Sequence, residues 1–347
     1  DNLTNAASPV FDVDFSKDIS GLTNTDFSNV GTAAGCSFAV GAPTGNSYPV
    51  TVSGCSEGTA ILRLALGAVA DTAGGQNAQT DGPTVTIDRT SPSVTINQAG
   101  GQADPTGVSP INFTAIFSEA VYGFNGLDVT AVTLSGTAGP TVWAVTGSGT
   151  TYTVAVSNMV TSPGTVIADV KAGAATDAAG NDNLASTSTD NSVLYNSTAP
   201  IASINLQATS DSGISNVDNI TNEATLLFDV AFDEAVSGLA NGDFTNAGTA
   251  TLCTFAVGVP TGNTYPVTVS NCTEGTLIVR LAAGAVTNTA AVPNALTNGP
   301  TVTIDRTGPN VTVNQAIGQN DPTNASPIEF TAVFNEPVTG FATGDVT

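Results

Sequence analysis

Acidic and amide side chains gather in two short phrases of the chain, and their oxygen atoms suit a hard cation. Glu119 lies in the phrase FSEAVYGFNGLDVT (residues 117–130), and Asp177 lies in TDAAGNDN (residues 176–183). Ca²⁺ prefers carboxylate and amide oxygens, in sets of about six to eight. The chain has no His, and it offers no thiolate cluster for zinc or copper. The predicted ligands are Asp88, Glu119, Asp128, Asp177, Asn181 and Asn183.

The same phrases also fit a plain turn that holds no metal. Asp and Asn side chains commonly cap backbone amides in tight turns, and the Gly of DAAGN suits such a turn. An Asp follows the Glu phrase in every copy of the repeat described below, which suits either a ligand or an obligatory turn. These four residues are Asp26, Asp128, Asp243 and Asp345.

The elements that position these residues repeat along the chain. The phrase GPTVTIDRT occupies residues 82–90 and recurs letter for letter at residues 299–307, which is 217 residues later. A weaker half-period appears in the junction phrases DRTSP, NSTAP and DRTGP, which begin at Asp88, Asn196 and Asp305. A unit of about 108 residues is a usual size for one β-sandwich domain. Fixed-period similarity therefore predicts a tandem array of like domains.

Four segments follow from these junctions. Two whole domains are expected at residues 90–197 and 198–306. Residues 1–89 are expected to form a domain that lacks its first strand, and residues 307–347 the start of a further domain. The sequence is therefore expected to be a window on a longer protein.

Strand-like runs in residues 90–197 predict the fold. Seven short runs rich in β-branched residues alternate with turns, without helical periodicity. Seven strands in about 108 residues predict an immunoglobulin-like sandwich, and the whole chain is predicted to be all-β, with such domains in an elongated array. The runs are Ser93–Asn97, Ile111–Phe117, Asp128–Leu134, Thr141–Val145, Thr151–Ser157, Gly164–Val170 and Asn191–Tyr195.

This topology predicts where the cation site lies. The loop after the second strand and the loop before the seventh strand share one pole of a sandwich, and the chain enters at that pole. Glu119 and Asp128 would come from one loop and Asp177 from the other, while Asp88 would arrive from the preceding domain. Calcium is therefore predicted at the junction of residues 1–89 with residues 90–197.

Comparison of the repeat copies predicts which junctions bind calcium and which do not. The junctions that precede residues 90–197 and 307–347 carry Asp88 and Asp305, whereas the junction between them carries neutral Asn196. Glu336 repeats Glu119, so Asp305 and Glu336 are predicted metal ligands as well. In the other two segments the matching positions carry Lys17 with Asp71, and Glu234 with Asn288. Lys17 would place an ammonium where a metal would otherwise lie, and calcium is expected to be weak or absent at Asn196.

The four Cys follow the longer period. Cys36 and Cys55 are 19 residues apart, as are Cys253 and Cys272, and each pair flanks two strand-like runs joined by a PTGN turn. A hairpin can bring such Cys within bridging distance, so disulfides Cys36–Cys55 and Cys253–Cys272 are predicted; the alternative is two pairs of buried free thiols. A disulfide implies an oxidising place and hence export.

Composition excludes several functions. The chain has 29 acidic and six basic residues, with a formal net charge of −23, which repels nucleic acid and anionic membranes. No apolar stretch approaches the roughly 18 residues of a membrane span, so no direct membrane insertion is expected. Without His, neither a Ser-His-Asp nor a Cys-His arrangement can be built. An enzyme is therefore not expected.

The phrases together resemble a known family. FSEAVYGF and its copy FNEPVTGF (residues 334–341), DAAGN and the D-x-T-x-P junctions are similar to the tandem bacterial immunoglobulin-like repeats of very large secreted surface proteins, the biofilm-associated and adhesin type. The segment of Lys17 fits this pattern less well. The resemblance implies a sandwich fold, an extracellular or cell-surface location and often bound calcium.

Three functions are compatible with these features. The first is a structural region of an extracellular prokaryotic stalk, sheath or filament, stiffened by disulfides and junction calcium. The second is an adhesin segment that binds a surface, a host or a glycan, and the third is a passive spacer. The near-identity of the copies favours the first and third, because a dedicated binding site usually differs from its neighbours. The expected partners are neighbouring repeats of the same protein, or identical chains in a fibre that exchange a strand beside residues 7–15.

Overall fold

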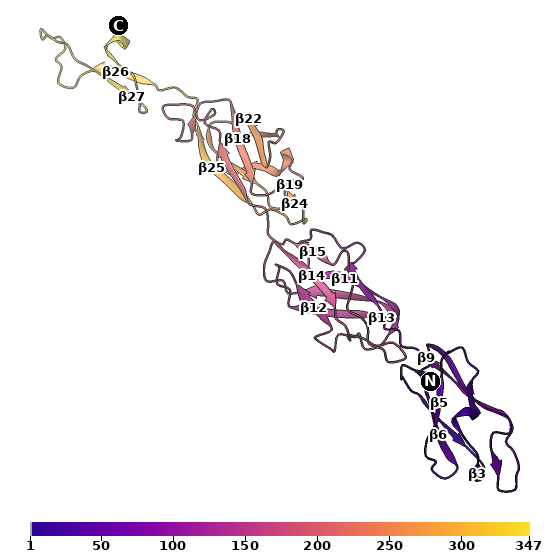
Figure 1. The fold of residues 1–347 in the computed structure, drawn as a ribbon. Helices are drawn as coiled ribbons and strands as arrows, with labels where there is room; N and C mark the ends of the chain where they lie inside the picture. Colours follow the sequence, from indigo (N-terminus) through magenta and orange to yellow (C-terminus); the bar gives the residue numbers. More distant parts are fainter. Residues whose placement is uncertain (1) are drawn as a thin grey trace. The chain divides into compact units, whose positions relative to one another are not determined.

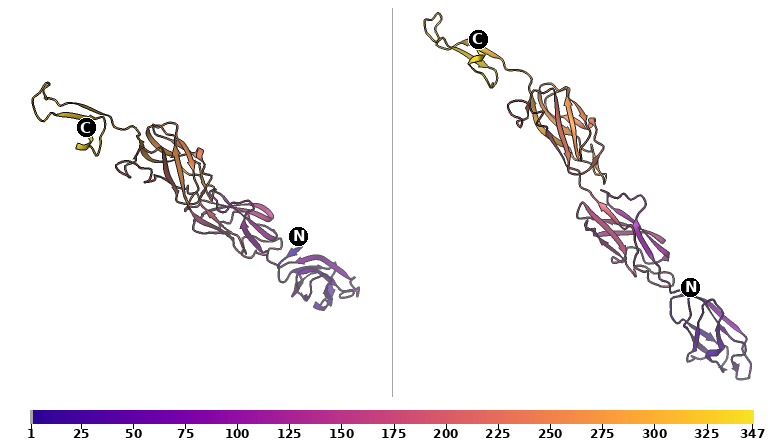
Figure 2. Two further views of the ribbon diagram at one scale, coloured as in Figure 1. Left: turned by 90° about the horizontal axis from the view of Figure 1, so that it is seen from above. Right: turned by 45° about the horizontal axis from the view of Figure 1, so that its top comes forward.

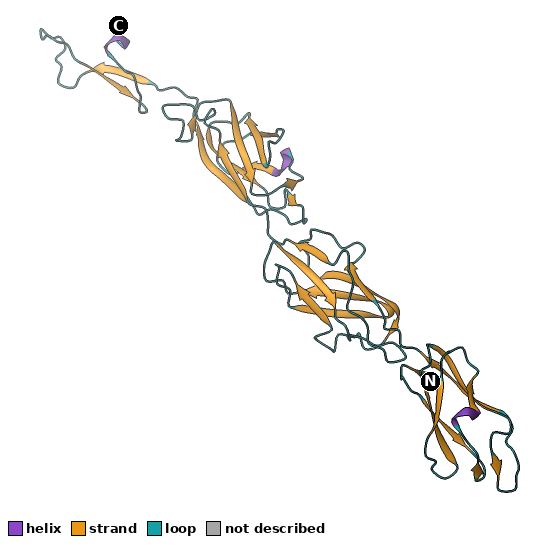
Figure 3. Ribbon diagram, viewed as in Figure 1, coloured by secondary structure: helices purple, strands orange, loops and turns teal. Residues whose placement is uncertain are grey.

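The computed structural model describes residues 2–347, and the fold is all-β (Figure 1). Strands account for nearly all regular structure, and short 3₁₀ turns are the remaining elements of the described chain (Figure 3). The chain divides into two compact units, residues 1–198 and 199–347, which are described separately below. Figure 2 shows the same strands from two further directions. The 3₁₀ turns are η1 (Asn24–Asp26), η2 (Asn241–Asp243) and η3 (Thr343–Asp345).

Residues 2–89 form two sheets around one apolar core. The first sheet has the order β2-β6-β5, and the second has the order β1-β9-β7-β4, in which β1 pairs with β9 in parallel. A short ribbon of β3 and β8 lies at one edge. The strands are β1 (Leu3–Thr4), β2 (Val10–Asp14), β3 (Ile19–Ser20), β4 (Phe27–Asn29), β5 (Ser37–Val40), β6 (Ser47–Ser53), β7 (Gly58–Leu64), β8 (Ala70–Asp71) and β9 (Thr80–Ile87).

Residues 90–197 form a second sandwich, with sheets β10-β11-β13 and β12-β14-β15. Thr106 and Tyr195 form a parallel bridge, so an early segment again pairs in parallel with the last strand. The strands are β10 (Val94–Gln98), β11 (Ile111–Val121), β12 (Val132–Ser135), β13 (Val142–Ser157), β14 (Gly164–Val170) and β15 (Ser192–Tyr195).

Three of the strand runs predicted for residues 90–197 differ from the structure. The runs predicted at residues 141–145 and 151–157 belong to the single strand β13, because Gly147 and Gly149 bend the chain at positive φ without ending the strand. The run predicted from Asp128 begins only at Val132, because the residues before it form a turn. The segment therefore has six strands rather than seven.

Alternation of apolar and polar residues explains why β11 lies in the core. Ile111, Phe113, Ala115 and Phe117 face inward and are buried, while the residues between them are more exposed. Phe117 also makes edge-to-face contacts with the rings of Phe124 and Tyr152.

Residues 198–306 repeat the first sandwich with an additional strand. The sheets are β16-β18-β22-β21 and β17-β25-β23-β20, and β17 pairs with β25 in parallel. The strands are β16 (Ala202–Leu206), β17 (Ile220–Thr221), β18 (Thr225–Phe232), β19 (Val236–Ser237), β20 (Phe244–Asn246), β21 (Thr254–Val257), β22 (Thr264–Ser270), β23 (Gly275–Leu281), β24 (Thr287–Asn288) and β25 (Thr297–Ile304).

Residues 307–347 contribute one hairpin, β26 (Val311–Gln315) with β27 (Phe330–Phe334). Its large side chains, among them Val313 and Phe330, are exposed.

Both disulfides, Cys36–Cys55 and Cys253–Cys272, are present. Cys36 precedes β5 and Cys55 follows β6, so the bond closes a hairpin within one sheet rather than joining the two sheets. Arg89 donates to the carbonyl oxygens of Cys55 and Ala6, both at 2.9 Å, and so ties the exit of the segment to this hairpin. Within the described chain, no helix is both long enough and apolar enough to cross a membrane.

Candidate metal centre

Three elements of the first unit bring three carboxylates together. Asp88 follows β9 at the exit of residues 1–89, Glu119 lies on β11, and Asp177 lies in the loop between β14 and β15. The pairing of β11 with β13 is irregular between Ile116 and Val121. An irregularity of this kind re-aims side chains, and Glu119 lies within it.

The three carboxylates are close to one another. Each offers an oxygen within 4.8 Å of the oxygens of the other two, and the described residues contain no other such cluster of His, Cys, Asp or Glu. Asp177 is only 4% exposed, while Asp88 and Glu119 are half-buried. Like charges at this separation repel one another, and partial burial weakens the screening by water. The arrangement therefore favours a bound cation.

The loop holds Asp177 in its charged form. Burial alone would raise the pKa of Asp177, but hydrogen bonds from the Asn181 side chain and from the backbone of Asn181, Ala179 and Gly180 outweigh it and lower the pKa. Asn181 donates from Nδ2 to Asp177 Oδ2 at 2.8 Å and from its backbone N–H to Asp177 Oδ1 at 2.8 Å. Asp177 is thus an anion fixed by its own turn.

Glu119 shows the opposite behaviour. Burial, followed by the negative charges of Asp177 and Asp88, raises the pKa of Glu119. The negative charges of Asp177 and Asp88 therefore disfavour a charge on Glu119, and a bound cation would offset this repulsion.

Asn181 joins the two segments of this unit. Besides its bonds to Asp177, its Nδ2 donates to the backbone carbonyl oxygen of Asp88 at 3.0 Å. The predicted ligand Asn181 thus lies at the cluster, with its amide nitrogen committed to other groups. Asn5 also borders this loop, since a Cβ on Gly180 would lie 3.4 Å from Asn5 Nδ2.

Sequence reasoning missed Asn5, although a signal was available. The phrase DNLTN at residues 1–5 recurs as DNITN at residues 218–222. Asn222, the copy of Asn5, lines a cavity of about 270 Å³ together with Asp305 and Arg306. Both Asn residues therefore lie near the exit of their own segment.

Two predicted ligands act as turn residues. Asp128 Oδ1 accepts hydrogen bonds from the backbone N–H and the hydroxyl of Thr130, both at 2.8 Å, and Asp128 is not part of the cluster. Its copies Asp26, Asp243 and Asp345 likewise accept backbone N–H groups at the start of 3₁₀ turns.

Asn183 is the second turn residue. It is 1% exposed, its Oδ1 accepts from Ala175 N–H, and its Nδ2 donates to the carbonyls of Lys171 and Leu184. Its amide is therefore hydrogen-bonded within the loop, and Asn183 helps to hold the loop that carries Asp177.

Asp305 and Glu336 belong to the second unit, and neither is part of a cluster of three acidic residues among the described residues. Asp305 Oδ1 accepts the backbone N–H of Thr307 at 3.1 Å.

The two copies of the Glu119–Asp177 pair each make a hydrogen bond between their own two residues. In residues 1–89, Lys17 Nζ lies 2.8 Å from Asp71 Oδ2. In residues 198–306, Asn288 Nδ2 donates to Glu234 Oε1 at 3.1 Å. An ammonium and an amide thus occupy the positions at which Glu119 and Asp177 present two carboxylates.

No protein-family model and no curated protein matches the sequence. Among solved structures, the chain is similar to FdeC, described as a broadly conserved Escherichia coli adhesin, with 14% identity and a TM-score of 0.34 over 85% of this chain and 98% of that chain.

Proposed function

We propose that this chain is a structural repeat region of an extracellular prokaryotic stalk, sheath or filament, in which Ca²⁺ at Asp88, Glu119 and Asp177 fixes one segment against the next. The observation that carries the proposal is the convergence of these three carboxylates at the contact between residues 1–89 and 90–197. Oxygen ligands of this kind suit Ca²⁺, and water completes its coordination.

The internal copies support this proposal. The same repeat positions are satisfied by Lys17 with Asp71 and by Asn288 with Glu234. Among the described residues, only the Glu119–Asp177 pair lies beside a third acid, Asp88. This cluster of three carboxylates contains no Lys or Arg. A divalent cation would neutralise two of the three charges and would connect ligands from both segments.

The disulfides support an extracellular location. Two hairpins are closed by Cys36–Cys55 and Cys253–Cys272, and structural disulfides persist in oxidising compartments. The net charge of −23 also favours cations as partners. Neighbouring repeats of the same protein are the partners we propose.

Calcium titration of the full chain tests the proposal. Isothermal titration calorimetry on the metal-free protein is expected to show one tight site per chain. Glu119→Gln and Asp177→Asn should each weaken it at least tenfold, while Asp128→Asn, which changes an exposed turn acid, should leave it unchanged. Equal effects from all three variants, or no saturable binding, would reject the site.

Small-angle scattering tests the structural role. Chelation is expected to broaden the distribution of particle dimensions of the wild-type chain, and re-addition of Ca²⁺ to narrow it again. The Glu119→Gln chain should resemble the chelated wild type under both conditions. If Ca²⁺ binds without any change in scattering, the site exists but does not fix the two segments.

A further inference from the structure

Two Arg residues occupy equivalent repeat positions but face different partners. Arg63 on β7 lies directly opposite Asp81 on β9, and Arg280 on β23 lies directly opposite Asn298 on β25. Arg280 repeats Arg63, and Asn298 repeats Asp81, each at the spacing of 217 residues that separates the two copies. The Arg therefore faces a side-chain carboxylate in the first copy and a side-chain amide in the second.

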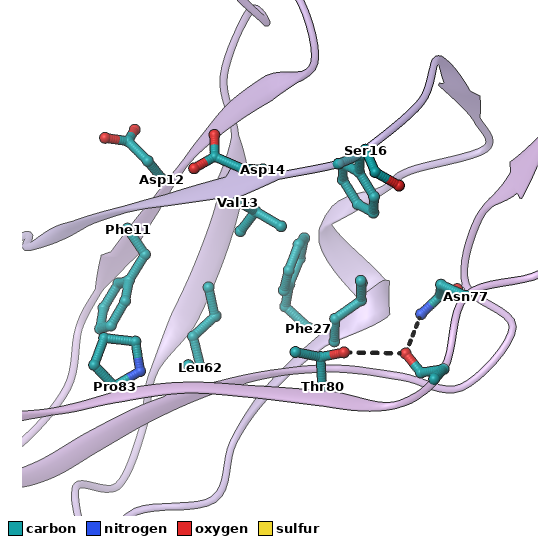
Figure 4. A pocket seen from close by; sticks show the side chains of 14 residues that line it. Phe11, Asp12, Val13, Asp14, Ser16, Phe27, Leu62, Asn77, Thr80 and Pro83 are labelled. Atoms are coloured by element: carbon teal, nitrogen blue, oxygen red, sulfur yellow. Dashed lines mark hydrogen bonds between the residues drawn. The ribbon is translucent and has the colours of Figure 1, made fainter.

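The first copy shows how a carboxylate fits at this position. Arg63 donates from Nε to Asp81 Oδ1 at 2.5 Å and from Nη2 to Asp81 Oδ2 at 2.7 Å. Such a two-point contact matches the planar guanidinium to the planar carboxylate. β9 forms one wall of the pocket in Figure 4, where the labelled Thr80 and Pro83 flank Asp81 and Gly82 along the chain. The strand thus accommodates a carboxylate opposite the Arg.

The second copy offers the Arg fewer acceptor atoms. Arg280 donates from Nε to Asn298 Oδ1 at 2.9 Å. The other end of the amide is the Nδ2 amino group, which is itself a donor and cannot accept from the guanidinium. Asn298 therefore presents one acceptor atom to Arg280, whereas Asp81 presents two to Arg63.

Gly299 follows Asn298, and this order opens the amide to attack by the main chain. The backbone nitrogen of the next residue can reach the side-chain Cγ of an Asn, and Gly permits this most easily because it has no Cβ. Asn298 is exposed. The pairing of β23 with β25 is irregular between Ile278 and Arg280, in the stretch that includes Gly299, and β17 pairs only with the end of β25. A regular ladder would hold the backbone at Gly299 more firmly.

Arg280 is placed to promote this attack. When the Gly299 nitrogen adds to Cγ of Asn298, negative charge gathers on Oδ1, the atom that accepts the Nε–H of Arg280. Donors aimed at an oxygen on which charge develops lower the barrier.

The reaction balances with water as the co-reactant. A succinimide ring forms as the bond from the Gly299 nitrogen to Cγ is made and the bond from Cγ to Nδ2 breaks, and ammonia leaves with the proton of the Gly299 nitrogen. Water then adds to Cγ, the bond from Cγ to the Gly299 nitrogen breaks, and that nitrogen regains a proton. The proton of the new carboxyl group passes to ammonia, so residue 298 is left as an aspartate.

The chain contains three Asn-Gly pairs, and they differ in what is bonded to the amide oxygen. Asn125 Oδ1 accepts the backbone N–H of Leu127 at 3.1 Å, and Asn241 Oδ1 accepts that of Val257 at 2.7 Å. These donors are neutral, whereas the donor to Asn298 is a guanidinium. Hydrogen bonds from charged donors are roughly twice as strong as neutral ones, so Asn298 carries the most strongly polarised amide of the three.

We propose that Asn298 is a site of spontaneous deamidation promoted by Arg280, and that the aspartate produced forms with Arg280 the two-point ion pair that Asp81 forms with Arg63. The modification needs no enzyme and no cofactor. The second copy thereby acquires after synthesis the ion pair that the first copy carries in its sequence. This inference is independent of the metal site.

Incubation of the full chain at mildly alkaline pH tests the proposal. Peptide mass mapping over time follows the replacement of NH₂ by OH at each Asn-Gly pair, with Asn241 as the reference in the same molecule. Asn298 is expected to react about threefold faster than Asn241 or more, because its donor is charged. Aspartate rather than isoaspartate is the expected main product, because Arg280 also polarises Cγ of the succinimide. A reaction at Asn298 that is absent, or no faster than at Asn241, overturns the proposal.

Variants of Arg280 separate the effect of its charge from loosening of the fold. Arg280→Met should slow the reaction at Asn298 relative to Asn241 by about threefold or more, while Arg280→Lys should keep most of the rate. Global loosening would speed the reaction at both Asn residues, so the ratio of the two rates removes it. An unchanged ratio in the Arg280→Met chain overturns the role of the Arg.

A further variant tests the product. Asn298→Asp introduces the carboxyl group directly, and carboxyl NMR titration should show its pKa lowered, as the hydrogen bond from Arg63 lowers the pKa of Asp81. The shift should disappear when Arg280→Met is added to the same chain. An ordinary pKa for the introduced carboxyl group would show that the ion pair does not form.

Discussion

Lys17 Nζ lies 2.8 Å from Asp71 Oδ2, at the repeat positions that Glu119 and Asp177 occupy in the next segment. The same repeat positions therefore carry an ion pair in one segment, a pair of acids in the next and a Glu–Asn pair in the third. The exchange of a single residue type, Lys for Glu, decides whether the site contains its own cation.

The Lys17–Asp71 pair predicts a pH dependence in acid. The hydrogen bond from Lys17, followed by those from the backbone of Gly75 and Ala73, lowers the pKa of Asp71 to about 2. Because the folded pKa lies below the unfolded value, the stabilisation is present above about pH 4 and is lost as the pH falls towards 2. Lys17→Met should raise the Asp71 pKa towards its ordinary value, which carboxyl NMR titration measures. An unchanged Asp71 titration would show that the backbone bonds alone set it.

Glu119→Gln should have opposite effects with and without calcium. In chelator at pH 7 the variant removes like-charge repulsion and should raise the stability of residues 90–197, by up to about 1 kcal/mol. In Ca²⁺ it should lose most of the metal-dependent gain in melting temperature. Differential scanning calorimetry in both conditions measures the two effects, with Asp128→Asn as the control. A variant destabilised in both conditions would assign Glu119 a purely structural role.

Removal of one disulfide should lower the stability of only the segment that contains it. Cys36→Ala combined with Cys55→Ala opens a loop of 19 residues, and it is expected to destabilise residues 1–89 by about 3 kcal/mol. Residues 198–306 keep Cys253–Cys272 and serve as the internal control. Hydrogen exchange resolved by segment measures both, and equal loss of protection in the two segments would contradict the expectation.

Asn183→Ala should damage the loop without removing a ligand. The change leaves the N–H of Ala175 and the carbonyls of Lys171 and Leu184 without their partners. The bond to Ala175 is buried, whereas the bonds to Lys171 and Leu184 are part-buried and water can replace them. One unsatisfied buried group costs about 1–3 kcal/mol. Urea unfolding should show a loss in this range, while calorimetry should still find one Ca²⁺ per chain at saturation. A variant of wild-type stability would contradict the turn role.

Most of the fold could be predicted from local sequence patterns. Alternation in residues 111–117 places β11, and the matching Cys spacings give the two closed hairpins. β13 is longer than predicted because the sequence does not tell whether Gly147 and Gly149 end a strand or bend it.

Site residues are harder to predict because the same residue types serve ligands and turns. Asp128 and Asp177 are both predicted ligands, yet only Asp177 is held beside Glu119 and Asp88. The difference arises from the irregular pairing of β11 and from the buried hydrogen bonds of Asn183, and both depend on contacts between residues distant in sequence. Calcium itself stays a prediction.

The parallel pairing of an early segment with the last strand has a mechanical consequence. Each of three segments contains such a parallel pair: β1 with β9, Thr106 with Tyr195, and β17 with β25. When such a segment is pulled from its two ends, the paired strands are drawn past each other, and their hydrogen bonds are loaded together instead of one after another. Arg89 and Arg306 add bonds from the exit of their segments to Cys55 and Cys272, so tension at those exits also reaches loops closed by a covalent bond.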